Sequence, residues 1–340
     1  MNNVAIVILN WNGKKHLETF LEKVVLYSGE CRIVLADNAS TDDSVKYVTE
    51  NFPTVEIIIN DENGGFSKGY NDALKAVESE YYILLNSDIE VTPNWVIPLF
   101  ETMKDTSVAG CQPKVLSYLN KSVFEHAGAS GGYLDKNYYP FCRGRIFEKF
   151  EEDKGQYNGE TEIFWATGAA LMIRSKLFHQ VGGFDSYFFA HMEEIDLCWR
   201  LKKQGYKIMA IPSSTIYHLG GGTLAYNSPR KLYLNFRNSL FMIVKNHEGI
   251  LLFKLINRMI LDGIAAIRFL IKGEFKNFSS VFNAHVAMYN RFPTLLRQRK
   301  EIKKTSANFN SKGLYKGSIL WARYFKGITY FKDLNQRFFD

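Results

Sequence analysis

One apolar run limits most strictly what this chain can fold into: Tyr81 to Leu85, which ends in Asn86-Ser87-Asp88. An unbroken run, rather than an alternating one, predicts a strand covered on both faces, as in an α/β sheet. Ligands of open α/β sheets bind just beyond the carboxyl ends of the strands. Asn86 and Asp88 can therefore offer side-chain oxygens to one divalent cation. An Asn-Ser-Asp turn that caps the next helix explains these residues equally well.

Strands alternate with helices around this run, which predicts βαβ units and a mainly parallel sheet. The apolar patterns predict strands at 4–9, 32–36, 55–59, 81–85, 108–116, 162–165, 169–174 and 206–211, with a strand-like piece at 215–217. Helices are expected from about residue 14, from about 41, at 66–77, from 93 to about 103, from 175 to 182, and at 193–204.

Two stretches break this alternation. Residues 117 to about 160 are polar, aromatic and Gly-rich, which suggests a flexible loop over a cleft. After residue 228 helical patterns dominate, at 229–246, 250–271 and 275–288, and basic residues culminate in Arg297-Gln298-Arg299-Lys300. We therefore expect a domain boundary near residue 228.

The net charge and the cysteines limit the classes of partner and the compartment that are expected. The net charge of +7 suits anionic partners such as nucleotides, nucleic acids or an anionic membrane surface. No nucleic-acid reader motif is present, so nucleic acid is not expected. The four cysteines are scattered without a CxxC pair, as in a cytosolic protein with reduced thiols. A signal peptide is not expected, because the apolar run at 4–9 has no basic region before it. A transmembrane span is not expected either, because the apolar segment 250–271 is broken by four charged residues.

Several residues could carry chemistry, each with a plainer alternative. Asp37 ends a predicted strand and could bind a base or ribose, or cap a helix. The segment 63–71 opens a helix with paired glycines, which suits phosphate, although a simple loop-to-helix junction is favoured.

Two later groups have the same ambiguity. Glu193 and Glu194 begin a helix, where the helix dipole favours acids, and one of them could be a general base. Asp196 and Arg200 are expected to pair on the helix surface. His218 is either structural or a further ligand for a metal at Asp88.

The order of the motifs is more informative than any one of them. In sequence they are Asn10-Trp11-Asn12-Gly13, Asp37-Asn38-Ala39-Ser40-Thr41-Asp42, Asn63-Gly64-Gly65-Phe66-Ser67-Lys68-Gly69-Tyr70-Asn71, Leu85-Asn86-Ser87-Asp88, Trp165-Ala166-Thr167-Gly168-Ala169, Gly182-Gly183-Phe184-Asp185, Glu193-Glu194-Ile195-Asp196-Leu197-Cys198-Trp199-Arg200 and His218-Leu219-Gly220-Gly221-Gly222. This ordered set resembles the family 2 inverting glycosyltransferases, nearest to their bacterial rhamnosyltransferase-like branch. The resemblance covers roughly residues 1–245.

The resemblance implies a GT-A fold, an α/β nucleotide-binding fold. The nucleotide-sugar half would cover about 1–116, the acceptor half about 117–228, and a basic helical extension 229–340. It implies Mg²⁺ or Mn²⁺ at Asp88 and His218, and Glu194 as catalytic base with Glu193 as the alternative. The nucleotide-sugar would be bound by Asn10, Asn12, Asp37, Asn38, Gly65, Lys68, Asn71, Asn86, Ser87, Trp165, Thr167 and Gly168.

Two residues depart from the family pattern. Asn86 stands where the first acid of the family's DxD motif is usual, which removes one charge and suggests weaker metal affinity. Glu194 stands where Asp is usual, which keeps the carboxylate and lengthens its reach.

The implied function is transfer of a sugar, rhamnose or a hexose, from a nucleoside-diphosphate sugar to a hydroxyl of a glycan or lipid-linked acceptor in cell-surface polysaccharide assembly. A sugar nucleotidyltransferase is the alternative enzyme, but such enzymes have a Gly-rich, Arg-containing loop where this chain has Asn10 to Gly13. A non-catalytic nucleotide-binding protein is the other alternative. A cytoplasmic protein is expected, peripheral on the inner face of the plasma membrane through its basic helical tail, unless that tail is only a soluble packing domain.

Overall fold

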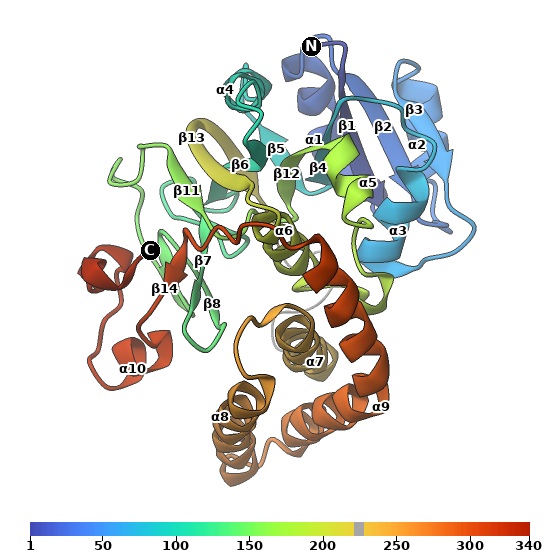
Figure 1. Ribbon diagram of the computed structural model, residues 1–340. Helices are drawn as coiled ribbons and strands as arrows, with labels where there is room; N and C mark the ends of the chain where they lie inside the picture. Colours follow the sequence, from blue (N-terminus) through green and yellow to red (C-terminus); the bar gives the residue numbers. More distant parts are fainter. Residues whose placement is uncertain (221–227) are drawn as a thin grey trace.

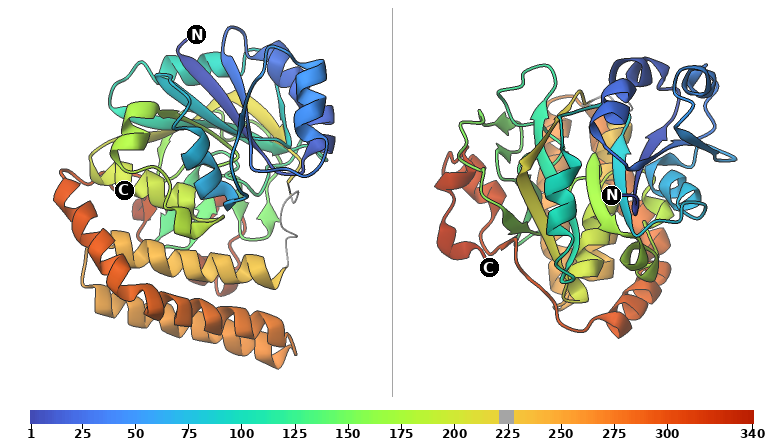
Figure 2. Two further views of the ribbon diagram at one scale, coloured as in Figure 1. Left: turned by 90° about the vertical axis from the view of Figure 1, so that its right-hand side faces the viewer. Right: turned by 90° about the horizontal axis from the view of Figure 1, so that it is seen from above.

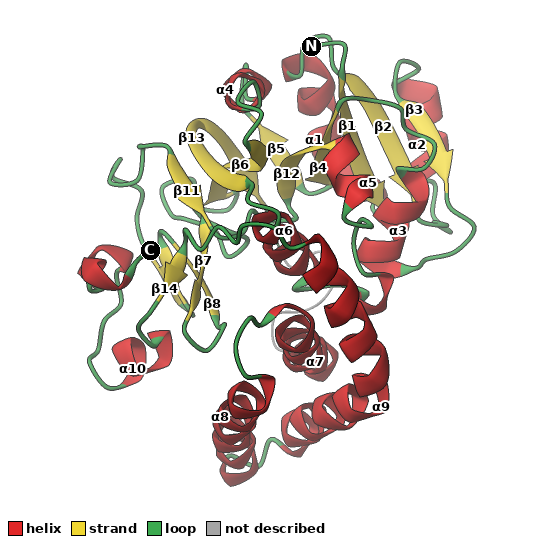
Figure 3. Cartoon of the chain, in the orientation of Figure 1, coloured by secondary structure: helices red, strands yellow, loops and turns green. Residues whose placement is uncertain are grey.

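The computed structural model describes residues 1–220 and 228–340, and its centre is a nine-stranded sheet (Figures 1 and 3). Its strands run in the order β11-β13-β6-β12-β4-β1-β2-β3, and β5 pairs with β13. Strands β1, β2, β3 and β4 are parallel, whereas β12 is antiparallel to both β4 and β6. A mainly parallel sheet with helices on both faces is the architecture that the alternating sequence pattern predicts.

The elements of the first half are β1 (Val4–Asn10), α1 (Lys14–Tyr27), β2 (Arg32–Asp37), α2 (Ser44–Asn51), β3 (Glu56–Ile59), α3 (Gly65–Ala73), β4 (Tyr81–Asn86), β5 (Ile89–Val91), α4 (Val96–Thr102), β6 (Val108–Ser117), β7 (Gly132–Asp135), β8 (Pro140–Cys142), β9 (Arg145–Ile146) and β10 (Lys149–Phe150). Those of the second half are β11 (Thr161–Ile163), β12 (Ala170–Arg174), α5 (Ser175–Gln180), η1 (Ser186–Phe188), α6 (Glu193–Lys203), β13 (Lys207–His218), α7 (Pro229–Asn246), α8 (Leu251–Ile271), α9 (Phe275–Thr305), β14 (Leu314–Tyr315), α10 (Ile319–Tyr324), η2 (Phe331–Asp333) and η3 (Gln336–Phe338).

Strand β4 lies in the middle of the sheet and is buried on both faces, as its unbroken apolar run predicts. Tyr82 and Leu84 point into the core shared with α3, α5 and α6. Tyr81, Ile83 and Leu85 point the other way, into the core shared with α1, α2 and α4. Because side chains alternate along a strand, both faces are filled only when every position is apolar.

The prediction of a flexible loop at residues 117 to about 160 is wrong. This stretch contains β7 to β10, which form a second sheet in the order β10-β9-β8-β7-β14. Strand β7 and residues such as Phe141 and Ile146 are buried. The strands are only two to four residues long, too short to show a periodic pattern in the sequence.

Several predicted boundaries also change. Residues 206–211 and 215–217 are one strand, β13, which passes Pro212 at an irregularity in its pairing with β6. Helix α9 does not end at Met288 but continues to Thr305 past Pro293, where it bends (Figure 1). Helix α3 ends at Ala73 rather than at residue 77.

Helices α7, α8 and α9 form a layer below the large sheet (Figure 2, left). Residues Leu240 to Val244 of α7 belong to the same core as α6. The chain after Thr305 leaves the helices and returns to the small sheet, where β14 pairs with β7. The extension at 229–340 is therefore made of long helices only up to Thr305, beyond which it adds β14 and short helices. The division at residue 228 stays a prediction. Among the described residues, no helix has the length and apolar content needed to cross a membrane.

Candidate active site

A cavity of about 830 Å³ opens at the carboxyl ends of β1, β4 and β13. Its volume lies in the range typical of small-molecule sites. Thirteen of the sixteen residues expected at the site line it. They are Asn10, Asn12, Asn38, Gly65, Asn86, Ser87, Asp88, Trp165, Thr167, Gly168, Glu193, Glu194 and His218.

Asp88 and His218 lie side by side on one wall of this cavity. Asp88 follows β4, and β5 then pairs antiparallel with the end of β13, which brings His218 opposite Ile89. The Asp88 Oδ1 to His218 Nε2 distance is 3.2 Å, and His218 Nδ1 lies 3.0 Å from Glu125 Oε2. Burial alone would lower the pKa of His218, but the two carboxylates raise it to about 10. In this state His218 is a cation between two acids.

Asp88 and His218 could hold a divalent cation as two protein ligands. His218 Nε2 and the Asp88 carboxylate are adjacent, and Glu125 on Nδ1 would orient the imidazole as carboxylates orient metal-bound histidines. Metal binding at such a site displaces the proton. No group of three or more metal-ligating side chains is found in the described part of the chain. A divalent cation with two protein ligands would complete its coordination shell with phosphate and water.

Glu193 and Glu194 begin α6 at the edge of the cavity. One carboxylate oxygen of each, Oε2, is buried without a hydrogen-bond partner among the described residues. Burial raises the pKa of Glu194 to about 7, while burial and the charge of Glu194 raise the pKa of Glu193 well above its usual value. Glu194 is thus the acid that ionises first near neutral pH. Such a poised carboxylate has the property required of a general base.

The turn that leads into α6 is strained. Phe189, His191 and Met192 have φ values of 64°, 70° and 72°, in the left-handed region that non-glycine residues rarely adopt. Asn238 on α7 holds this turn, since its Nδ2 donates to the carbonyl oxygens of Phe188, Ala190 and His191 at 3.0, 2.9 and 2.7 Å. Nothing in the sequence indicated this role of Asn238.

A buried network fixes the other side of α6. Asp196 accepts hydrogen bonds from Arg200, Lys245 and Asn246. Lys245 also pairs with Asp185 at 2.8 Å. The expected Asp196–Arg200 pair is present, but it is buried rather than on the helix surface, because α7 packs over it. The helix that carries the two glutamates is therefore anchored to α7.

The polar residues at the nucleotide end are extensively hydrogen-bonded. Asn10 Nδ2 donates to Asp37 Oδ1 at 3.0 Å, and Ser40 N donates to Asp37 Oδ2 at 2.8 Å. Asn12 Oδ1 accepts from the backbone of Thr41 at 2.7 Å. Asp37 is buried and does not line the cavity, but its bond to Asn10 holds a residue that does.

Lys68 and Asn71 also lie outside the cavity. Lys68 pairs with Asp72 and Glu62 at the surface, and Asn71 holds the backbone of Phe184. The first amides of α3 are used as well, because Phe66 N and Ser67 N donate to Phe189 O.

Gly65 has a packing role beside that turn. Its φ is +77°, and a Cβ there would lie 2.6 Å from Phe189 O. The glycine pair thus allows close backbone packing, in addition to lining the cavity.

Trp165, Thr167 and Gly168 also line the cavity. Trp165 Nε1 donates to Tyr133 O at 3.0 Å, and Thr167 N donates to Gln112 Oε1 at 3.0 Å. A Cβ on Gly168 would lie 3.0 Å from Phe66 and 3.8 Å from Glu194 Cβ, so the backbone here borders the general-base candidate.

Six further basic or imidazole side chains, none of them expected from the sequence, line the cavity: His16, His126, Arg145, His191, Arg230 and Lys231. Burial lowers the pKa of His126 to about 3 and that of His191 to about 4, so both imidazoles are neutral. His126 and Arg145 lie in the stretch taken for a loop, which gave no pattern. Of the final predicted motif, Gly221 and Gly222 lie outside the described residues.

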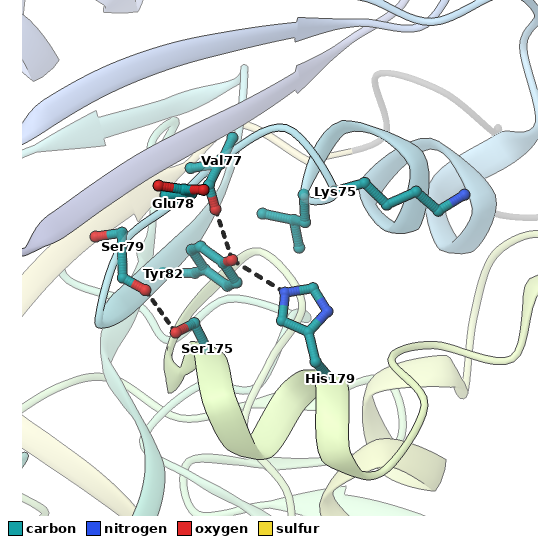
Figure 4. Close-up of a pocket in the computed structure, with 8 residues that line it drawn as sticks. Lys75, Val77, Glu78, Ser79, Tyr82, Ser175 and His179 are labelled. Carbon is teal, nitrogen blue, oxygen red and sulfur yellow. Dashed lines mark hydrogen bonds between the residues drawn. The ribbon is translucent and has the colours of Figure 1, made fainter.

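A second hollow lies at the opposite end of β4 (Figure 4). Tyr82 Oη donates to Val77 O at 2.7 Å and lies 3.0 Å from His179 Nε2. Ser175 Oγ donates to Ser79 O. It contains none of the expected site residues, so the large cavity is the candidate site.

Comparison with known proteins identifies the family. The family model described as glycosyl transferase family 2 matches residues 5–182. An N-acetylglucosaminyl-diphospho-decaprenol L-rhamnosyltransferase of Mycobacterium tuberculosis is 23% identical over 262 residues, 72% of this chain and 85% of that protein. Rhamnosyltransferase WbbL of Escherichia coli is 21% identical over 63% of this chain and 83% of its own.

Solved structures show the same fold at low identity. A mannosyltransferase from Pyrobaculum calidifontis, in complex with GDP-Man and Mn²⁺, has a TM-score of 0.52 at 12% identity and covers 89% of this chain and 85% of its own. GalNAc-T7 with UDP, GalNAc and Mn²⁺ has a TM-score of 0.55 at 16% identity, over 72% of this chain and 48% of its own. With its GT-A fold, the chain therefore belongs to glycosyl transferase family 2, as a rhamnosyltransferase-like member.

Proposed function

We propose that this glycosyltransferase moves a sugar from a nucleoside-diphosphate sugar to an acceptor hydroxyl with inversion at the anomeric carbon. The observation that carries the proposal is one cavity with Asp88 and His218 on one wall and the poised Glu194 on another. A single displacement needs a base on the acceptor side and charge stabilisation on the leaving-group side, and these two groups supply that pair of functions.

Glu194 is assigned as the base that takes the proton from the attacking hydroxyl. Its pKa of about 7 leaves a substantial ionised fraction at neutral pH, whereas the pKa of Glu193 lies higher. Glu193 beside it would stay protonated, so that only one of the two carboxyl groups on this wall carries a negative charge. Asn238 and the strained turn position both residues.

Asp88 and His218 are assigned to the leaving diphosphate, with Glu125 orienting His218. A divalent cation held by these residues would neutralise the charge that develops on the leaving group. Asn86 and Ser87 would add neutral polar contacts. Arg145, Arg230 and Lys231 give the cavity a cationic wall, which favours a substrate with phosphates.

The donor sugar is proposed to be rhamnose or a hexose, and the acceptor a glycan or a lipid-linked sugar. Support comes from the relatives: one is named a rhamnosyltransferase on a diphospho-decaprenol acceptor, and another, of Haloferax volcanii, a low-salt glycan biosynthesis hexosyltransferase. We also propose a cytoplasmic protein at the membrane surface. Its four cysteines are free and buried, as suits a reducing compartment.

The test is a donor panel. Purified protein is incubated with dTDP-rhamnose and UDP-hexoses in turn, with a simple glycan acceptor, and nucleoside diphosphate release is measured with Mg²⁺, with Mn²⁺ and with a chelator. We expect metal-dependent release with one donor class, and nuclear magnetic resonance of the product should show inverted anomeric configuration. Retained configuration, or full turnover in chelator, would contradict the proposal.

A further inference from the structure

Helix α8 has an apolar face that no described residue covers. The α8 stripe consists of Phe253, Ile256, Ile260, Ile264, Ile267 and Ile271, which are between 46% and 81% exposed. Their spacing of three and four residues places them along one side of the helix. The opposite side, with Leu255, Ala266 and the Arg258–Asp262 pair, packs against the protein.

The first half of α9 extends this surface. Phe275, Phe282, Val286 and Tyr289 are also exposed, at helical spacing. Tyr289 Oη donates to Met259 Sδ on α8 at 3.4 Å, so the two exposed faces adjoin. The two helices form the layer farthest from the large sheet (Figures 1 and 2). Large contiguous apolar surfaces are uncommon on proteins that have no partner there.

The charge of this region indicates what the partner is. Residues 250–305 contain 11 Lys and Arg against 3 Asp and Glu, a net charge of +8, whereas the rest of the chain has 31 and 32, a net charge of −1. Where α8 meets α9, Arg268, Lys272 and Lys276 are exposed beside Ile271 and Phe275. None of these three cations forms an ion pair with a described residue.

We propose that the α8 stripe and the adjoining face of α9 lie on an anionic lipid bilayer. The apolar side chains would enter the boundary between headgroups and acyl chains, and Arg268, Lys272 and Lys276 would meet the lipid phosphates. A second copy of the chain fits less well, because pairing these faces would bring two segments of +8 together. The inference depends on exposure and charge and is independent of the transfer chemistry in the cavity.

The test is co-sedimentation of the full chain with vesicles of phosphatidylcholine alone, or with about one-third phosphatidylglycerol, at low and high salt. We expect binding only to the anionic vesicles, weakened by salt. The variant Arg268→Ser/Lys272→Ser/Lys276→Ser should bind about 100-fold more weakly, since each cation near anionic lipid contributes about tenfold or less. The variant Ile256→Ser/Ile260→Ser/Ile264→Ser should also bind more weakly than the wild type, with a loss no larger than that of the cation variant.

Matched controls remove equal charge or apolar surface elsewhere: Lys46→Ser/Lys149→Ser/Lys176→Ser and Leu26→Ser/Ile59→Ser/Leu119→Ser. Both should bind like the wild type. Equal loss in the controls, or no binding by the wild type, would overturn the proposal. So would light scattering that shows a wild-type dimer converted to monomer by the isoleucine variant without any vesicle binding. Activity on a soluble acceptor, measured in parallel, reports the transfer function separately.

Discussion

Replacing Asn238 changes the geometry of the site without changing any group that is proposed to take part in the reaction. Its side chain is not among those assigned to substrate binding, but its amide donates to three carbonyl oxygens of the turn before Glu193. Asn238→Ala removes the donor to the carbonyl oxygens of Ala190 and His191, whereas Phe188 O keeps hydrogen bonds from Arg237 Nη2 and Ala190 N. Each carbonyl left without a partner costs about 1–3 kcal/mol. One amide has two hydrogens, so we expect a total loss of about 3 kcal/mol.

The loss should fall first on the turn. Three of its residues have left-handed φ values, a conformation that costs about 1–3 kcal/mol each and persists only where the surroundings enforce it. Without the clamp, we expect the turn to relax and displace Glu194, so that kcat falls by about 10- to 100-fold. The KM for the donor should change little, because Asp88 and His218 lie on other elements.

The assay combines initial rates for the active donor with urea unfolding followed by tryptophan fluorescence. Asn310→Ala is the control: Asn310 Nδ2 donates to Glu162 and Tyr206 O, away from the cavity. It should lose stability without losing kcat. An Asn238→Ala enzyme with wild-type kcat, under conditions where it is folded, would refute the reasoning.

Four further predictions concern charged side chains in and around the site. Because Glu194 must be ionised to act and its folded pKa is about 7, kcat/KM should rise as the pH increases through about 7; a profile flat from pH 5 to 8 would exclude it as the base. The pKa of Glu194 in the folded protein lies above its value in the unfolded chain, so burial of the ionised form destabilises the protein as the pH rises from about 4.5 through 7. Glu194→Gln should therefore be inactive, but its melting temperature should be higher than that of the wild type at pH 8 and equal to it at pH 4. Asp88→Ala should keep the fold by circular dichroism and lose transfer, and added Mn²⁺, which should reactivate chelator-treated wild type, should not rescue it. Lys245→Met leaves Asp185 and Asp196 buried without their shared cation and should lower the free energy of unfolding by about 3–5 kcal/mol, whereas Lys276→Met at the surface should change it little.

The sheet was predictable because its strands carry continuous apolar runs. Tyr81 to Leu85 is such a run, and the position of Asp88 at its end follows from the rule for open α/β sheets. Helix α7 also begins and ends where its pattern predicts, with Ser228 capping its first turn.

Other features have no local signal. Strands β7 to β10 are too short to show a period, and the continuation of α9 past Pro293 depends on the burial of Leu295 and Arg299 against the protein. Glu125 could not be found as the partner of His218, because 93 residues separate them.

The expected site residues fall into two groups in the same way: those placed by the sheet and those included for their motif. Residues at strand ends, such as Asn86 and Asp88, line the cavity as their position implies. Lys68 and Asn71 were included for their motif alone, and both make local contacts with other parts of the protein instead. Sequence motifs therefore located the cavity, while the contacts that shape it came from packing.

The return of the last residues to the small sheet has a consequence for the order of folding. Ile319 N donates to Asp135, 184 residues earlier, and Phe331 N donates to Glu151, 180 residues earlier. Contacts so far apart in sequence form slowly, because a long loop must close first. The edge of β7 stays open until β14 pairs with it, and open strand edges invite association between chains. During synthesis, the small sheet, which contains Arg145, would thus be completed late and would be the part most exposed to aggregation.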